Sequence, residues 1–175
     1  MKRLIKTIFI ATTLAMSACT PTPKTDETMN RTIRIGTEQF TASLDSALEW
    51  NGWFTVRYGI GETLFKVEDD MQIKPWLVSN AENIDAKTWK LTLRENIKFS
   101  DGTTMDAKSV VDNLHHIAQE NARAAFLQGA EYEIDGYTIT IKTVDSRATL
   151  LSDLSDPMFA MLNLDSKEDK ATMPI

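Results

Sequence analysis

Alternating apolar and polar residues, the pattern of half-buried strands, stand out in two stretches. Over 88–94, TWKLTLR, the apolar positions Trp89, Leu91 and Leu93 share one face. A second alternation over 131–143, EYEIDGYTITIKT, is interrupted by Asp135-Gly136, a pair that favours a tight hairpin turn. We therefore predict a strand over 88–94 and a hairpin over 131–143. The apolar face of the second hairpin strand would carry Tyr137, Ile139 and Ile141.

A helical period follows the turn signal Asp101-Gly102 within 99–119. Thr103 and Asp106 have the spacing of a capping box, in which two side chains satisfy the free amide groups at a helix start. The apolar positions that recur at helical spacing are Val110, Val111, Leu114, Ile117 and Ala118. This segment is expected to be a long helix with one buried face.

The remaining elements are shorter. We predict a strand over 32–36, a shared helical face for Leu44 and Leu48, and a turn into a new element over 73–77. A short amphipathic helix over 146–157 would stop at Asp156-Pro157, and an apolar strand would follow over 158–162. Because helices and strands are interspersed, the pattern predicts an α/β or mixed α+β domain.

The N-terminus has the layout of a secretory signal. A positive segment with Lys2, Arg3 and Lys6 precedes an apolar run that is shorter than the roughly 20 residues of a spanning helix. The run ends in MSAC at Cys19, the chain's single cysteine. MSAC resembles the lipobox of bacterial lipoproteins, which implies cleavage after Ala18 and acylation of Cys19. An ordinary signal peptide with a chance cysteine is the alternative. We expect a signal peptide over 1–18 and an acylated cysteine with a flexible tether over 19–31.

Charge and motifs narrow the function classes. With 19 basic and 25 acidic residues the net charge is −6, so nucleic acid is not an expected partner. The sequence contains no GxSxG, HExxH, Walker or GxGxxG motif, and no nucleophile stands with a base. His115 and His116 are adjacent, and neighbouring helical residues point about 100° apart, so they are not expected to share a metal. We expect neither an enzyme nor a protein with a cofactor.

Two features could contact a ligand. Four aromatic residues crowd into 50–58, namely Trp50, Trp53, Phe54 and Tyr58, and they could form either core or a lined pocket. Arg123 follows the long predicted helix, and its guanidinium could hold a carboxylate in two hydrogen bonds or simply form a surface salt bridge.

Several segments taken together resemble one family. They are SLDSAL, YGIGETLFKVEDDMQIKPWLV, TWKLTLRENIKFSDGTTMDAKSVVDNL, IDGYTITIKT and LLSDLSDPMFAML. The chain resembles the extracytoplasmic solute-binding lipoproteins of peptide/nickel ABC importers, solute-binding family 5, from about Ile33 to its end. The most specific match is LRENIKFSDGTTMDAKSVVDNL, with a KFxDG turn between strand and helix. Ser46 departs from the family, which usually has proline there.

The resemblance implies a type II periplasmic-binding-protein-like fold. Residues 32–175 would form a partial solute-binding domain, and 46–165 the small subdomain of its first lobe. The family is about three times longer than the mature chain, so we expect an incomplete first lobe without the C-terminal lobe. Alone, such a chain is expected to bind solute weakly or not at all.

The resemblance also implies a function. Family members capture a solute outside the cytoplasmic membrane and deliver it to ABC permease subunits without breaking a bond. Trp50, Trp53 and Phe54 fall where the family lines its pocket, and Arg123 and Phe126 match an arginine and aromatic of the nickel and metallophore binders. Those binders carry a second arginine near the position of Pro157, which is missing here. Peptide is therefore the first expected solute and a nickel or opine-type chelate the second; an anchored hydrolase or a structural lipoprotein is less favoured.

Overall fold

The computed structural model describes residues 34, 36 and 43–165. The chain divides into two compact units between Gly36 and Thr37, and the account below concerns the second unit. The signal peptide, Cys19, the tether and three of the five residues of the strand predicted over 32–36 lie outside the described residues. Within the described residues, no helix combines the length and apolarity that crossing a membrane requires.

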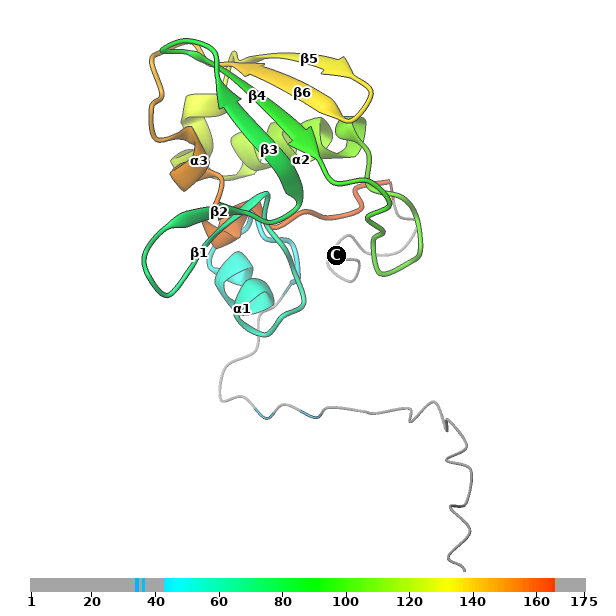
Figure 1. Ribbon diagram of the computed structural model, residues 1–175. Coiled ribbons are helices and arrows are strands. Elements are labelled where there is room, and N and C mark those ends of the chain that lie inside the picture. The colour runs from blue at the N-terminus through cyan, green and yellow to red at the C-terminus, as the bar shows by residue number, and fades with distance from the viewer. Residues whose placement is uncertain (1–33, 35, 37–42, 166–175) are drawn as a thin grey trace, which may run out of the picture. The chain divides into compact units, whose positions relative to one another are not determined.

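A four-stranded antiparallel sheet in the order β3-β4-β6-β5 organises the second unit (Figure 1). The strands are β3 (Val78–Asn83), β4 (Thr88–Leu93), β5 (Glu131–Asp135) and β6 (Thr138–Lys142). The predictions of a strand over 88–94 and of a hairpin over 131–143 are confirmed, and Gly136 takes the positive φ of 59° that the turn requires. Tyr137, expected on one face of this strand together with Ile139 and Ile141, lies in the turn and is exposed, whereas the two isoleucines are buried.

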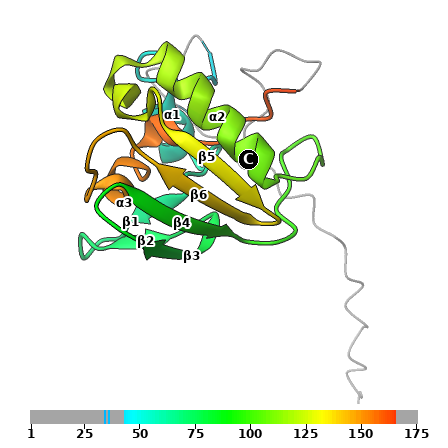
Figure 2. The ribbon, with the colours of Figure 1, turned by 90° about the horizontal axis from the view of Figure 1, so that it is seen from above.

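Helix α2 (Ala107–Glu120) lies against one face of the sheet, over β5 and β6 (Figure 2). The predicted apolar face is confirmed, since all five of its residues are buried. The predicted cap is wrong by one turn. Asp106, not Thr103, caps the helix: its Oδ1 accepts from the amide of Ser109 at 2.7 Å, and the Ser109 hydroxyl accepts from the amide of Asp106 at 3.0 Å. Thr103 instead donates to Asp101, because both belong to the turn that precedes the helix.

Replacing Asp106 by alanine is expected to lower the free energy of unfolding by about 1 kcal/mol, the usual effect of losing an N-cap side chain. Urea denaturation followed by circular dichroism measures the change. Thr103→Ala is the matched control and should cost clearly less, because Thr103 does not cap the helix. Equal losses for the two variants would contradict this assignment of the cap.

Smaller elements complete the unit. A two-stranded hairpin pairs β1 (Phe65–Val67) with β2 (Ile73–Pro75), so the turn predicted over 73–77 is in fact a strand followed by a bend that leads into β3. The helical pieces are α1 (Asn51–Arg57), η1 (Ala122–Leu127), α3 (Leu150–Asp153) and η2 (Pro157–Phe159).

Three predictions about these pieces are wrong. Leu44 and Leu48 lie in the loop and turns before α1 rather than in a helix. The helix over 146–157 reduces to the single turn α3. Residues 158–162 are buried as predicted but do not form a strand: η2 is followed by an extended segment whose backbone bonds to Glu62 and to the side chain of Asn113.

One hydrophobic core joins the sheet, α2, η1 and η2. Its largest fully buried side chains include Phe65, Leu91, Leu114, Ile139 and Phe159. Tyr132 of β5 packs at its edge, and burial raises the pKa of its phenol to about 12. Its buried hydroxyl has no hydrogen-bond partner within the described part of the chain.

Candidate solute-contacting site

An exposed aromatic surface covers α1 and the residue before it. Trp50, Trp53, Phe54 and Arg57 line a hollow of about 330 Å³. Trp50 is 64% exposed and Trp53 51% exposed, which is unusual for side chains that normally contribute most to cores. Exposed aromatic surface is typical of interaction sites, so this hollow is the candidate site for contact with another molecule.

The burial pattern of α1 is the reverse of that of an ordinary amphipathic helix, which buries its large apolar side chains. Its buried residues are the small or polar Asn51, Gly52 and Thr55, whereas its aromatic residues face outward. Gly52 makes this possible, because a Cβ added there would lie 2.3 Å from the carbonyl oxygen of Pro157 in η2. The backbone of α1 therefore lies directly on η2, and the large side chains have no room on that side.

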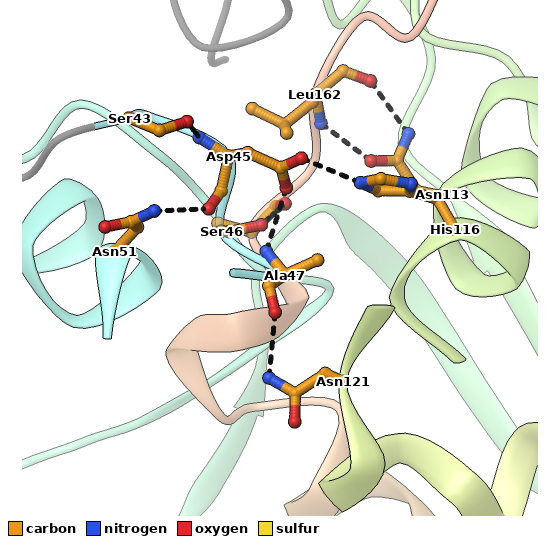
Figure 3. A network of polar contacts seen from close by, with 10 residues as sticks. Ser43, Asp45, Ser46, Ala47, Asn51, Asn113, His116, Asn121 and Leu162 are labelled. Atoms are coloured by element: carbon orange, nitrogen blue, oxygen red, sulfur yellow. Dashed lines mark hydrogen bonds and ion pairs between the residues drawn. The ribbon is translucent and has the colours of Figure 1, made fainter. Parts of the chain in front are cut away.

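A polar network fixes the segment that leads into α1 (Figure 3). The Asp45 carboxylate lies 2.9 Å from Nε2 of His116 on α2, and its other oxygen accepts from the amide of Ala47 at 3.0 Å. The side chain of Asn51 donates to the carbonyl of Asp45 at 3.1 Å, and Asn121 donates to the carbonyl of Ala47 at 2.9 Å. The C-terminal half of α2 thus helps to hold the segment before α1, through His116 within the helix and Asn121 just after it.

The two histidines have separate partners, as their spacing predicts. His116 faces Asp45, whereas the ring of His115 meets the ring of Tyr132 edge-on, with centroids 4.9 Å apart. Among the described residues there is no group of three or more histidine, cysteine or acidic side chains placed to hold a metal ion.

Arg123 and Phe126 lie on η1 and contact the segment that contains η2. Arg123 pairs with Asp156, so the surface salt bridge considered from the sequence is the interaction observed. Phe126 is half-buried, with its ring centroid 6.1 Å from that of Phe159 and 4.2 Å from the guanidinium carbon of Arg147. The structure thus groups the three aromatics of 50–54 in one hollow and places the η1 pair in a second cluster that also borders η2.

Sequence reasoning missed Arg57 and Asp156. Arg57 follows Trp50, Trp53 and Phe54 at intervals of seven, four and three residues, so helical spacing alone could have placed it on the same surface. Asp156 was read only as a helix stop, although its side chain accepts from the amide of Met158 and pairs with Arg123.

Comparison with known families identifies the chain. The model of the bacterial extracellular solute-binding proteins, family 5 Middle, matches residues 72–175. The chain belongs to solute-binding protein family 5. The family predicted from the sequence motifs is therefore confirmed.

Individual family 5 proteins show the same relationship. The nickel-binding protein NikA of Staphylococcus aureus is 27% identical over 175 residues, which is 99% of this chain and 34% of that protein. The nickel-binding periplasmic protein of Escherichia coli is 35% identical over 75 residues, covering 42% of this chain and 14% of that protein. The chain thus spans about a third or less of the length of these curated relatives.

A solved family 5 structure supports the fold. The nickel ABC transporter protein of Bacillus halodurans superposes with a TM-score of 0.66 at 30% identity, over 72% of this chain and 27% of that one. The predicted mixed α/β fold of periplasmic binding proteins is confirmed for the part that this chain covers.

Proposed function

We propose that this chain forms the N-terminal part of the substrate-binding component of an ABC importer and contacts the solute through α1. The observation that carries the proposal is the exposed aromatic hollow of Trp50, Trp53, Phe54 and Arg57. Apolar aromatic faces with one cation suit a small organic solute that carries polar groups. The chain would bind and release this solute without chemical change, and permease subunits would be its partner.

Capture by such a receptor is a shift between conformations. A solute that contacts only the open hollow gains little, whereas one enclosed between two lobes contacts both and stabilises the closed state. The described residues supply one wall. We therefore expect the chain by itself to bind solute weakly, with a dissociation constant near 1 mM, or about 4 kcal/mol of binding free energy.

A nickel chelate is the first solute candidate, because the three relatives reported above are named for nickel. An organic chelator would bring apolar surface to the tryptophans and carboxylates to Arg57. Peptide, which the sequence motifs favoured, is the second candidate. An exposed aromatic surface accepts peptide side chains equally well, and no side chain of the hollow distinguishes the two classes.

The localisation proposal rests on the sequence of the N-terminus. We infer that Cys19 is acylated and that residues 20–31 tether the domain outside the cytoplasmic membrane. This agrees with the extracellular class to which the family belongs.

Tryptophan fluorescence tests the solute-contacting role. Titration of the chain with nickel and two equivalents of L-histidine, or with a tripeptide, should change the emission saturably for one of the two solutes. Trp53→Ala should weaken the binding about fivefold, the effect of losing roughly 1 kcal/mol of aromatic contact.

Trp76→Phe is the matched control, since Trp76 contacts Lys66 and does not line the hollow. It should leave the dissociation constant unchanged. Emission that neither solute alters, or a Trp53→Ala variant that binds like the parent, would contradict the role proposed for α1.

A further inference from the structure

We propose that Arg57 is a specificity-determining residue: it selects solutes that carry a carboxylate about one helical turn away from an apolar group. The proposal rests on the solute-contacting role proposed for α1, and it names the class of solute that the hollow would take. An organic acid with an apolar ring belongs to this class, whereas the uncharged amide of the same acid does not.

Arg57 lines the aromatic hollow itself. The other lining residues are Trp50, Trp53 and Phe54, none of which carries a charge, so Arg57 is the charged side chain of this hollow. Trp53 precedes Arg57 by four residues in α1, which puts the two side chains on one face of the helix with their Cβ atoms about 5–6 Å apart. A single solute could therefore lie on the Trp53 ring and reach the guanidinium at the same time.

The guanidinium of Arg57 is exposed and has no hydrogen-bond or ion-pair partner within 43–165, the continuous range that the structure describes. Every other arginine of this range does have a side-chain partner; these arginines are Arg94, Arg123 and Arg147. A solute anion that reached Arg57 would thus not have to displace an internal carboxylate of these residues. The cation of the hollow is available for binding.

The chemistry of the guanidinium favours a carboxylate over its neutral analogue. Its planar fork of N–H groups can donate two parallel hydrogen bonds to the two carboxylate oxygens, and both bonds are strengthened by charge. A carboxamide of the same shape offers one acceptor oxygen and no charge. Because Arg57 is exposed and water screens the pair, we expect the open hollow to prefer the carboxylate by about two- to fivefold.

Chemical modification tests the availability of Arg57 without any solute. Phenylglyoxal reacts with accessible guanidinium groups, and mass spectrometry of the peptides gives the rate at each arginine. Arg57 should react about two- to fivefold faster than Arg123, because the Arg123 guanidinium is paired with Asp156. A rate at Arg57 no higher than that at Arg123 would overturn the proposal, since the guanidinium would then be occupied.

Two matched probes test the specificity. N-acetylphenylalanine and N-acetylphenylalaninamide have the same apolar ring and differ in the charge of the carboxyl group, and titration of the full chain with each can be followed by tryptophan emission. The parent chain should bind the carboxylate about two- to fivefold more tightly than the amide. Arg57→Gln should bind the two probes equally, whereas Trp53→Ala should weaken the binding of both.

Lys74→Gln is the control for the loss of one positive charge, because Lys74 is exposed and does not line the hollow. It should keep the preference of the parent. Equal binding of the two probes by the parent, or an unchanged preference in Arg57→Gln, overturns the proposal but leaves the solute-contacting role of α1 standing. Emission that is altered neither by the probes nor by the two solutes named above overturns the proposed function, and the role of Arg57 with it.

Discussion

Gly52→Ala is expected to destabilise the domain by about 3 kcal/mol, although alanine normally stabilises a helix relative to glycine by up to about 1 kcal/mol. The added Cβ would lie 2.3 Å from the oxygen and 2.6 Å from the carbon of the Pro157 carbonyl. Both are backbone atoms, so no side chain can rotate away, and α1 or η2 must shift. The sign of the change is thus set by tertiary contact and not by helix propensity.

Urea denaturation measures the stability, and tryptophan emission reports α1 directly. The expected result is a lower midpoint together with an altered emission of the folded state, because Trp50 and Trp53 belong to the displaced surface. Solute binding should weaken in parallel.

Gly136→Ala is the control for Gly52→Ala. A Cβ at Gly136 meets nothing within 4 Å, and only the positive φ of 59° opposes it, at a cost of about 1–2 kcal/mol. This variant should lose stability without changing the emission that reports α1. If Gly52→Ala proved as stable as the parent, the close approach of α1 and η2 would be refuted.

Local patterns predicted the central elements of the fold correctly. The strand over 88–94, the hairpin about Asp135-Gly136 and the buried face of α2 all depend on periodicity and turn chemistry within about a dozen residues. The KFxDG turn that joins β4 to α2 also carried the family resemblance. These features are specified where they occur in the chain, so the sequence alone suffices to find them.

Contacts with particular residues determine the two features that the sequence predicted wrongly, the segment 158–162 and the cap of α2. Residues 158–162 are apolar like a strand, but their backbone partners are Glu62 and the Asn113 side chain, which are distant in the sequence. The cap of α2 moved to Asp106 because Thr103 is engaged by Asp101. The partners of 158–162 are not announced by its own sequence, whereas at the start of α2 all candidates are local and the folding of the turn decides between Thr103 and Asp106.

The candidate site was likewise predictable from the sequence only in part. Clustering of Trp50, Trp53 and Phe54 was visible in the sequence, but their outward orientation was not, because it depends on the contact of Gly52 with η2. For Arg123 the sequence offered a carboxylate site or a surface salt bridge, and only the fold places Asp156, 33 positions further along the chain, beside it.

Asn113→Ala is expected to lower the free energy of unfolding by about 3 kcal/mol, because it leaves two buried backbone groups without partners. The Asn113 side chain is 1% exposed. Its Nδ2 donates to the carbonyl of Leu162 at 2.8 Å, and its Oδ1 accepts from the amide of Leu162 at 2.9 Å. This pair of bonds ties the extended segment after η2 to α2.

Asn113→Asp separates hydrogen bonding from packing, because it keeps the size of the side chain. A carboxylate can still accept from the amide of Leu162, but it cannot donate to the Leu162 carbonyl and would face that oxygen with a buried charge. We therefore expect a loss at least as large as that of the alanine variant near neutral pH. Protonation of the carboxyl restores a donor, so the loss should shrink as the pH falls.

Asn83→Ala provides the matched control, because Asn83 makes one exposed bond from Nδ2 to the carbonyl of Asp85, at 2.9 Å. Its removal should cost less than about 1 kcal/mol, since water replaces the lost partner. Urea denaturation of the three variants at neutral pH, with Asn113→Asp repeated at pH 4, measures the differences. If Asn113→Ala cost no more than Asn83→Ala, the segment after η2 would have to be held by its apolar side chains and its other hydrogen bonds, such as the one to Glu62.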